Sequence, residues 1–316
     1  MKVLVTGATG YIGRVLTRKL LNQGHQVTAL VHREPLDALA PRGLQACQAD
    51  VRDLGAVHKA LRGIEAVCHL AGIADTNARR TFEGGYASVN LGGTLNLLRA
   101  LAQYADSTGR AAAFIHASTG SVYGQASVTP TPEYAITAPD SPYAASKLEA
   151  EAAIRSFSEA GAVAGISLRI FNVAGAEEGQ GDRNTSRILP RALEVAAARQ
   201  ATLPVYGTGS VVRDFVHVAD VADAYARAIG AATAGQFSVF NVGATRASIA
   251  DVVCTVEKVT GRQVPTRPTF AEPAVAQMHA DTSSIRTALG WRPMRSSLEQ
   301  IVSDAWSVVT APTTTS

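Results

Sequence analysis

The sequence has few cysteines, few aromatic residues and no long run of apolar residues. Its three cysteines, Cys47, Cys68 and Cys254, are widely spaced and form no CxxC pair. This pattern indicates neither a disulfide framework nor a cysteine metal site, and we expect reduced, mostly buried thiols. No apolar segment is long enough to cross a bilayer. The stretch MKVLVTG lacks the apolar core and cleavage site of a signal peptide, so we expect a cytoplasmic protein.

Long blocks of like charge are also missing. The 29 basic and 26 acidic residues are scattered along the chain and give a net charge of +3. This distribution argues against a nucleic-acid partner and against a membrane surface. The 316 residues are 47% hydrophobic and 17% charged, which suffices for a sizeable core in one large domain or two coupled domains.

The first half of the chain alternates short β-branched runs with longer helical patterns, as in a parallel sheet covered by helices. We predict helices over 13–24 and 86–105, and strands over 2–7, 26–31, 44–50, 66–72, 112–118 and 165–172. Right-handed crossovers then give an α/β fold with a doubly wound parallel sheet, which binds ligands at the carboxyl ends of its strands.

The alternation stops after Asn172, where the sequence becomes rich in glycine, proline and polar residues. We therefore predict a smaller, discontinuous second domain that binds the substrate. The predicted first domain covers 1–171 and about 209–230, and the second covers about 172–208 and 231–311. The last residues, 312–316, have no core-forming pattern and are expected to be disordered.

A glycine-rich turn, TGATGYIG, follows the first strand and opens the first helix. Gly7, Gly10 and Gly13 would allow a tight turn, close approach of the backbone to a pyrophosphate, and close packing of helix on sheet. Tyr11 and Ile12 lie within the same turn. The spacing is GxxGxxG, and such a turn can also be purely structural, but its place in a βαβ unit predicts a dinucleotide cofactor.

The ends of the second and third strands bear on which cofactor binds. Val31 stands where a dinucleotide fold usually carries an acid for the ribose hydroxyls, and His32 and Arg33 follow it. A missing carboxylate beside a cation slightly favours NADP over NAD, although Arg33 could be an ordinary loop residue. Asp50, followed by Val51, could accept a hydrogen bond from the adenine amine or cap a helix.

The stretch SPYAASK predicts the start of a helix with Pro142 in its first turn. Tyr143 and Lys147 are then one turn apart on one face, where the ammonium should lower the pKa of the phenol. Thr119, at the end of a predicted strand, could hold a substrate oxygen while Tyr143 moves its proton, and Ser118 is the second choice. The alternative is a surface helix with a chance Tyr/Lys pair.

Taken together, these motifs resemble those of the extended short-chain dehydrogenase/reductase superfamily, and within it the UDP-galactose 4-epimerase-like enzymes. The resemblance extends over about residues 2–306 through VLVTGATGYIG, HLAG, VNLGGTLNLL, STGSVYG, SPYAASKLEAE, RIFNVAGA and VVRDFVHVADVADA. It implies a Rossmann domain that binds NAD(P), with Tyr143 as acid/base, Thr119 as the catalytic hydroxyl, and Lys147 on the nicotinamide ribose. It also implies cofactor contacts from Leu70, Ala71, Gly72 and Asn90.

The same resemblance implies a nucleotide-sugar substrate, most simply a UDP-sugar, and a homodimer. Asn172 and Arg213 match residues that contact the diphosphate, and Tyr206 matches an aromatic residue near the base. Tyr206 could instead be a core residue, and Arg213 could form a structural ion pair with Asp214.

Two departures from the family pattern narrow the reaction. Dehydratases of this superfamily carry STDEVYG, whereas Gly120 and Ser121 occupy the acidic positions here, which argues against dehydration and against decarboxylation that uses the Glu. Many relatives carry RPGD near the C-terminus, whereas Ala271 and Ala274 stand in place of its arginine and acid. We expect a weaker diphosphate clamp or an altered ligand.

Three functions remain compatible with the sequence. A nucleotide-sugar 4-epimerase, which removes and returns a hydride at C4, is favoured by FNVAGA and VVRDFVHV. An NADPH-dependent 4-keto-sugar reductase is favoured by Val31 and Arg33. A nucleotide-sensing protein without turnover is opposed by the intact set of Thr119, Tyr143 and Lys147.

Overall fold

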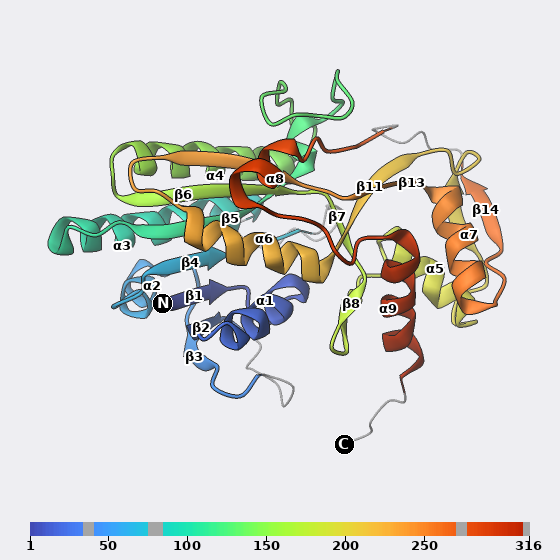
Figure 1. The fold of residues 1–316 in the computed structure, drawn as a ribbon, viewed down its shortest axis with the longest axis horizontal. Helices are drawn as coiled ribbons and strands as arrows, with labels where there is room; N and C mark the ends of the chain where they lie inside the picture. The colour runs from blue at the N-terminus through green and yellow to red at the C-terminus, as the bar shows by residue number, and fades with distance from the viewer. Residues whose placement is uncertain (34–40, 75–84, 270–276, 312–316) are drawn as a thin grey trace.

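The structure, a computed structural model, describes residues 1–33, 41–74, 85–269 and 277–311 (Figure 1). Its centre is a seven-stranded sheet with the order β12-β6-β5-β4-β1-β2-β3, and every pairing in it is parallel. The strands are β1 (Lys2–Thr6), β2 (Gln26–Val31), β3 (Gln45–Gln48), β4 (Ala66–His69), β5 (Ala112–Thr119), β6 (Val163–Ile170) and β12 (Phe237–Val242). The predicted doubly wound parallel sheet is therefore confirmed, and so are all six predicted strands.

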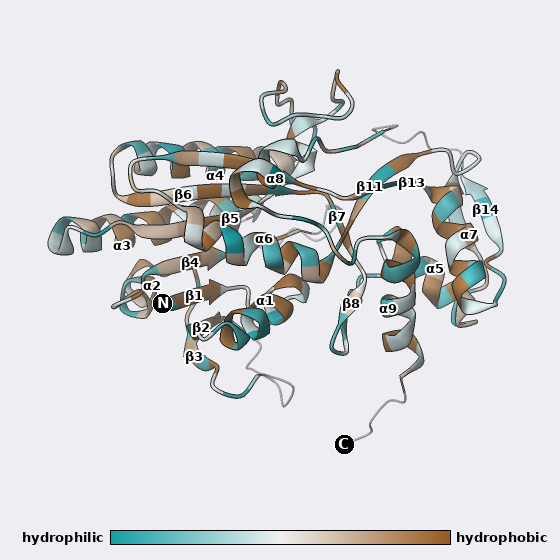
Figure 2. Ribbon diagram, in the orientation of Figure 1, coloured by the Kyte–Doolittle hydropathy of each residue, from teal (hydrophilic) through white to brown (hydrophobic). Residues whose placement is uncertain are grey.

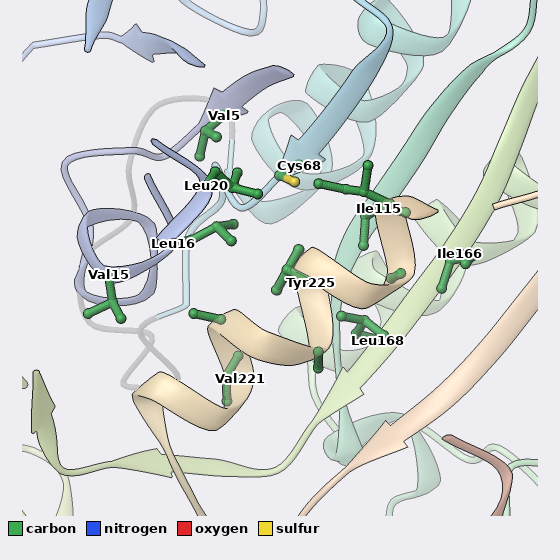
Figure 3. Packing of buried hydrophobic residues seen from close by; sticks show 14 of the residues in the cluster. Val5, Val15, Leu16, Leu20, Cys68, Ile115, Ile166, Leu168, Val221 and Tyr225 are labelled. Atoms are coloured by element: carbon green, nitrogen blue, oxygen red, sulfur yellow. The ribbon is translucent and has the colours of Figure 1, made fainter. Parts of the chain in front are cut away.

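Helices cover both faces of this sheet (Figure 1). One face packs against α1 (Tyr11–Asn22), α6 (Val218–Ala231) and α8 (Ser283–Leu289), and the other against α2 (Leu54–Ala60), α3 (Gly93–Thr108) and α4 (Pro142–Glu159). Successive side chains of a strand point to opposite faces, so Val3 and Val5 enter the first core while Leu4 enters the second. Figure 3 shows side chains of α1 and α6, among them Leu16 and Tyr225, packed against the strands.

A second group of elements lies at one end of the central sheet (Figure 1). A three-stranded sheet has the order β13-β11-β7, and two smaller pairs are β10-β14 and β8-β9. Their bounds are β7 (Asn172–Ala174), β8 (Ala176–Glu177), β9 (Gln180–Gly181), β10 (Leu203–Tyr206), β11 (Val212–His217), β13 (Thr245–Ser248) and β14 (Thr266–Thr269). The helices α5 (Ile188–Ala196), α7 (Ile249–Thr260) and α9 (Leu298–Thr310) share a separate hydrophobic core.

The predicted domain boundaries need correction at two places. We assigned 231–311 to the second domain, but β12 pairs with β6 and forms an edge of the central sheet. Ile285 and Trp291 likewise pack into the core beneath α1 and α6. The chain therefore returns to the first core after residue 231, and β11, which we placed in the first domain, pairs with β7 and β13.

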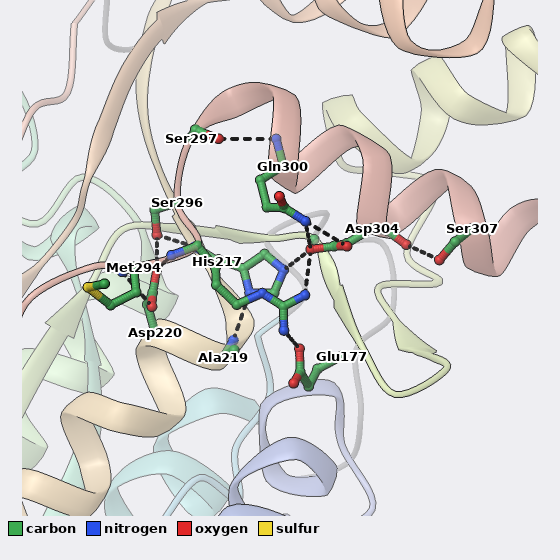
Figure 4. Close-up of polar contacts among 12 residues, drawn as sticks. Glu177, His217, Ala219, Asp220, Met294, Ser296, Ser297, Gln300, Asp304 and Ser307 are labelled. Atoms are coloured by element: carbon green, nitrogen blue, oxygen red, sulfur yellow. Dashed lines mark hydrogen bonds and ion pairs between the residues drawn. The ribbon is translucent and has the colours of Figure 1, made fainter.

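A polar network ties the C-terminal segment to the start of α6 (Figure 4). The carboxylate of Asp220 accepts hydrogen bonds from Ser296 Oγ at 2.5 Å and from the amide of Arg295 at 2.9 Å. His217 Nε2 lies 3.1 Å from Asp304 Oδ2 on α9. These contacts fix α9, and the core it belongs to, relative to the central sheet.

Hydropathy follows the layers. In Figure 2 the strands of the central sheet are mostly brown, whereas α6 alternates between brown and teal, as expected for strands buried on both faces and an amphipathic helix that covers them. Among the described residues, no helix combines the length and the apolar character needed to span a membrane.

Candidate active site

A cavity of about 1060 Å³ lies at the carboxyl ends of the central strands, between the sheet and α5. It is lined by most of the residues that the sequence predicted for the site: Gly7, Gly10, Tyr11, Ile12, Gly13, Leu70, Gly72, Ser118, Thr119, Tyr143, Lys147, Asn172, Tyr206 and Arg213. Segments from the whole length of the chain thus meet in one chamber, as a doubly wound sheet requires.

The glycine-rich turn has the geometry of a phosphate cradle. Gly7 has φ +67°, and a Cβ there would lie 2.8 Å from the amide nitrogen of Ala71. A Cβ on Gly13 would collide with the carbonyl of Gly7. Gly10 caps α1 without a side chain, which leaves the first amides of the helix open to an anion. The cradle therefore fits a dinucleotide pyrophosphate.

Tyr11 and Ala71 have structural contacts within this cradle. The Tyr11 hydroxyl donates to the carbonyl of Gly175 at 2.6 Å, and the amide of Ala71 donates to Thr6 Oγ1 at 3.0 Å. Burial raises the pKa of Tyr11, which keeps its phenol protonated. Tyr11 therefore joins the cofactor end of the chamber to the connection between β7 and β8.

Six of the predicted cofactor residues do not line the cavity: Ala71, His32, Arg33, Asp50, Val51 and Asn90. Val51 is buried beneath α3, and His32, Arg33 and Asp50 lie at the outer ends of β2 and β3. Asp50 lies 3.1 Å from His32 Nε2 and accepts from Arg52, whose hydrogen bond holds the pKa of Asp50 below its usual range. Asp50 does not cap α2, because that place is taken by Asp53, which accepts from the amide of Ala56.

The last of these predicted cofactor residues, Asn90, lies behind the cavity in a single π-helical turn, η1 (Ala87–Gly92). Its side chain donates to Ser146 Oγ at 3.0 Å and accepts from the amide of Ile73 at 2.8 Å. A Cβ at Gly72 would lie 2.8 Å from Asn90 Oδ1 and 3.3 Å from Lys147 Nζ. Asn90 therefore fixes the loop after β4 beside the lysine.

Tyr143 and Lys147 lie one turn apart at the start of α4, as predicted. Pro142 opens the helix and Ser141 caps it by accepting from the amide of Ala144 at 3.2 Å. Burial lowers the pKa of Lys147 to about 8. Burial also raises the pKa of Tyr143, while a hydrogen bond with Thr119 and the charge of Arg187 oppose this rise. Our expectation of a lowered pKa for the Tyr143 phenol is wrong, because the effect of desolvation outweighs those of the hydrogen bond and the neighbouring charge.

The structure distinguishes the two candidate hydroxyls. Thr119 shares a hydrogen bond with Tyr143, whereas Ser118 donates to the buried carboxylate of Glu151. Thr119 therefore remains our candidate for the hydroxyl that holds the substrate, and Ser118 is engaged elsewhere.

The opposite wall of the cavity carries the predicted substrate residues. Asn172 donates to the carbonyl of Asp214 at 3.0 Å. Tyr206 is 49% exposed, so it is not a core residue. The Asp214 carboxylate accepts from the amides of Ala244 and Ala280, whereas Arg213 donates to the carbonyl of Val212 at 2.9 Å, so the described contacts give no sign of the structural ion pair. Burial lowers the pKa of Arg213, which indicates a cation partly removed from water.

Two further arginines of the same wall were missed by sequence reasoning. Arg187 and Arg191 line the cavity at the start of α5, one helical turn apart. Arg187 lies 2.9 Å from Asp182, and Arg191 donates to the carbonyl of Thr185 at 3.0 Å. They lie in the glycine- and proline-rich segment after Asn172, where the sequence has no clear periodicity. The pair of arginines at a spacing of four was the signal available there.

Comparison with known proteins agrees with this geometry. Residues 3–243 match the model of the NAD dependent epimerase/dehydratase family. The chain belongs to this family. A curated relative, the UDP-glucose 4-epimerase of Streptomyces lividans, is 33% identical over 96% of this chain and 95% of its own length. The UDP-arabinose 4-epimerase 1 of Arabidopsis thaliana is 30% identical over 96% of this chain and 78% of its own.

Solved structures of this epimerase family have the same fold. The UDP-glucose 4-epimerase of Stenotrophomonas maltophila, with bound NAD and formylated UDP-arabinopyranose, superposes with a TM-score of 0.88 at 28% identity, over 98% of this chain and 97% of its own. The UDP-glucuronic acid 4-epimerase of Bacillus cereus, with UDP-glucuronic acid and NAD, gives 0.84 at 26% identity, over 98% and 99%. The predicted membership of the extended short-chain dehydrogenase/reductase superfamily is thereby confirmed.

Proposed function

We propose that this family member is a nucleotide-sugar 4-epimerase that acts on UDP-sugars with a bound nicotinamide cofactor. One observation carries the proposal: a single cavity joins the glycine-rich cradle, the Thr119–Tyr143–Lys147 set and a wall with three arginines. The cradle suits the pyrophosphate of the cofactor, and the arginines suit the diphosphate of a sugar nucleotide.

The protein residues divide the work of the reaction. Thr119 holds the C4 oxygen, and Tyr143 takes its proton and later returns it. The ammonium of Lys147 favours the phenolate and binds the nicotinamide ribose. Bound NAD supplies a reversible hydride acceptor, so no external reductant is consumed.

The wall opposite the cradle would hold the nucleotide while the hexose turns. Arg187, Arg191 and Arg213 line this wall, and we expect them to bind the diphosphate from one side. A ketone anchored only through its diphosphate can present either face to the cofactor, which epimerisation needs. Gly120 and Ser121 line the same cavity and replace the two acids that dehydratases carry at these positions, so these two residues do not support dehydration.

We propose NAD as the resident cofactor, in line with the NAD bound in solved relatives. The slight preference for NADP stays a prediction from Val31, His32 and Arg33. His32 is paired with Asp50, while Arg33 is exposed at the end of β2. The experiment that distinguishes NAD from NADP is to identify the co-purifying dinucleotide. Calorimetry with NAD and NADP on wild type and Arg33→Ala then measures the preference.

The test of the reaction is incubation with UDP-glucose, UDP-glucuronate and their N-acetyl analogues without added reductant, followed by separation of the products. We expect C4 epimers of at least one substrate. Conversion of a 4-keto sugar that depends strictly on NADPH would establish the reductase instead. Absence of both reactions in a cofactor-loaded protein would favour a sensing role.

Two further points remain predictions. The homodimer can be checked by light scattering, and the cytoplasmic location by fractionation. Ala271 and Ala274, and the tail 312–316, lie outside the described residues, so the predicted weaker clamp is tested best by measuring UDP affinity.

A further inference from the structure

A buried charged cluster lies directly behind the Thr119–Tyr143 pair. Ser118 donates its hydroxyl to Glu151 Oε1, and Arg169 binds both oxygens of the same carboxylate. The distances are 3.0 Å from Arg169 Nε to Oε1 and 2.7 Å from its terminal nitrogen to Oε2. The Arg169 and Glu151 side chains are 6% and 5% exposed. The carboxylate is thus fully engaged, by one hydroxyl and one bidentate guanidinium.

This cluster joins the two elements that carry the reacting groups. Ser118 precedes Thr119 at the end of β5, and Glu151 follows Tyr143 and Lys147 at successive turns of α4. β5 and α4 are therefore connected by the Ser118–Glu151 hydrogen bond, directly beside the Thr119–Tyr143 contact. A shift of the Ser118–Glu151 bond would move Thr119 relative to Tyr143.

The cluster is itself held on its far side. The second terminal nitrogen of Arg169 donates to the Tyr123 hydroxyl at 2.9 Å and to the carbonyl of Glu133 at 3.0 Å. Tyr123 in turn donates to Asn241 Oδ1 on β12 at 2.7 Å. Three neighbouring strands, β5, β6 and β12, thereby supply one rigid support for α4.

Stability alone gives a weak reason for this arrangement. A buried ion pair loses much of its attraction to desolvation, and apolar side chains of similar volume often stabilise a core as well. Its geometry, in contrast, is well suited to fixing a helix on a strand, because a bidentate guanidinium–carboxylate pair specifies orientation as well as distance.

We propose that Ser118 and Glu151 are positioning residues that hold Thr119 in hydrogen-bonding contact with Tyr143. The inference rests on the proposed role of Tyr143 as acid/base and deepens it. It assigns Ser118 a function different from that of a second catalytic hydroxyl. The hydroxyl of Ser118 sets the end of β5 against α4, so that Thr119 and the Tyr143 phenol face the same substrate oxygen.

The decisive variant is Ser118→Ala, which removes the contact but leaves the Glu151–Arg169 pair in place. We expect kcat to fall by about tenfold, equivalent to ~1.4 kcal/mol in the barrier, with KM and bound cofactor nearly unchanged. Because the Thr119 hydrogen bond lowers the pKa of Tyr143, its loosening should move the limb of the pH–kcat profile that reports Tyr143 to higher pH.

Ser167→Ala is the matched control. Ser167 is equally buried on the neighbouring strand β6, and its hydroxyl lies 3.3 Å from His116 Nδ1, outside the cavity lining. It should lose a similar amount of stability and keep the wild-type kcat and pH profile. Equal kcat and equal pH profiles in the two variants would overturn the proposal, and so would a loss in Ser118→Ala that appears entirely in KM.

Turnover is not required for the test. In protein with ¹³C-labelled tyrosine, the Tyr143 resonance is assigned with Tyr143→Phe and titrated by NMR. A higher phenol pKa in Ser118→Ala than in wild type and Ser167→Ala supports the positioning role, and identical values refute it. Failure of the wild type to epimerise any UDP-sugar would refute the proposed function alone.

Discussion

At Tyr143, our candidate acid/base, burial and neighbouring charge act in opposite directions. Water is excluded from the phenol, which raises its pKa, and the hydrogen bond with Thr119 and the charge of Arg187 lower it again. The same burial lowers the pKa of Lys147 to about 8. Lys147 is therefore closer to losing its proton near neutral pH than it would be in water, where its pKa is 10.5, whereas burial favours the protonated phenol of Tyr143.

Tyr143→Phe should reduce turnover by at least roughly a hundredfold, the usual contribution of a general acid/base. The fold and the bound cofactor should survive, since the phenyl ring fills the same space. Steady-state kinetics with a UDP-hexose and the ratio of NAD to protein check both points. Near-normal turnover in the variant would remove Tyr143 from the mechanism.

Lys147→Met should abolish activity without lowering the stability of the fold at pH 7. The folded-state pKa of Lys147 lies below its ordinary value, so the unfolded chain binds more protons between about pH 8 and 10.5, and stability rises with pH in that window. The variant should lack this rise, unfold at pH 7 no more easily than wild type, and lose activity. Thermal unfolding at saturating NAD across this range tests it, and the same rise in the variant would contradict it.

At the scale of the element, the strands and the start of α4 were predictable because their signals are local. KVLVT and AVCH are short β-branched or apolar runs, and Ser141-Pro142 marks a helix start. β12 was missed because FSVFNV follows a helix within an otherwise mixed stretch and pairs with β6, far away in sequence.

The site shows the same limit. Gly7, Tyr143 and Lys147 belong to compact motifs, whereas the contact of Ser118 with Glu151 spans 33 positions and depends on how β5 and α4 pack. Arg187 enters the cavity only because α5 folds back over the strand ends. Sequence patterns identify residues within one element, and packing decides which elements meet.

The start of α2 provides a prediction at this scale. Asp53 caps the helix, so Asp53→Ala should cost ~1 kcal/mol of stability and leave NAD affinity unchanged. Asp50→Ala should leave the stability nearly unchanged and reduce the NAD affinity, because Asp50 does not cap the helix and is our candidate for the adenine contact. Unfolding temperature and calorimetric NAD affinity of the two variants decide the matter. A loss of cofactor affinity in Asp53→Ala alone would reverse the assignment.

For the whole molecule, the cavity lies where two hydrophobic cores meet. The cradle and Tyr143 belong to the central sheet and its helices, and Arg187 and Arg191 belong to α5, which packs in the other core. A ligand that contacts both walls therefore bridges parts of the chain that are distant in sequence, and its binding stabilises the pair of cores together.

UDP should accordingly raise the unfolding temperature of the NAD-loaded protein. A ligand that binds only the folded state adds about 2.7 kcal/mol at a concentration one hundred times its Kd. Arg213→Ala should remove most of this gain, because it removes the partly buried guanidinium that we propose binds the diphosphate. Arg199→Ala is the control, since Arg199 pairs with Glu194 at the surface and does not line the cavity.

Thermal unfolding in a UDP titration measures the effect, and added salt should weaken it. An unchanged UDP response in Arg213→Ala, with a reduced one in Arg187→Ala, would place the diphosphate against α5 instead of β11.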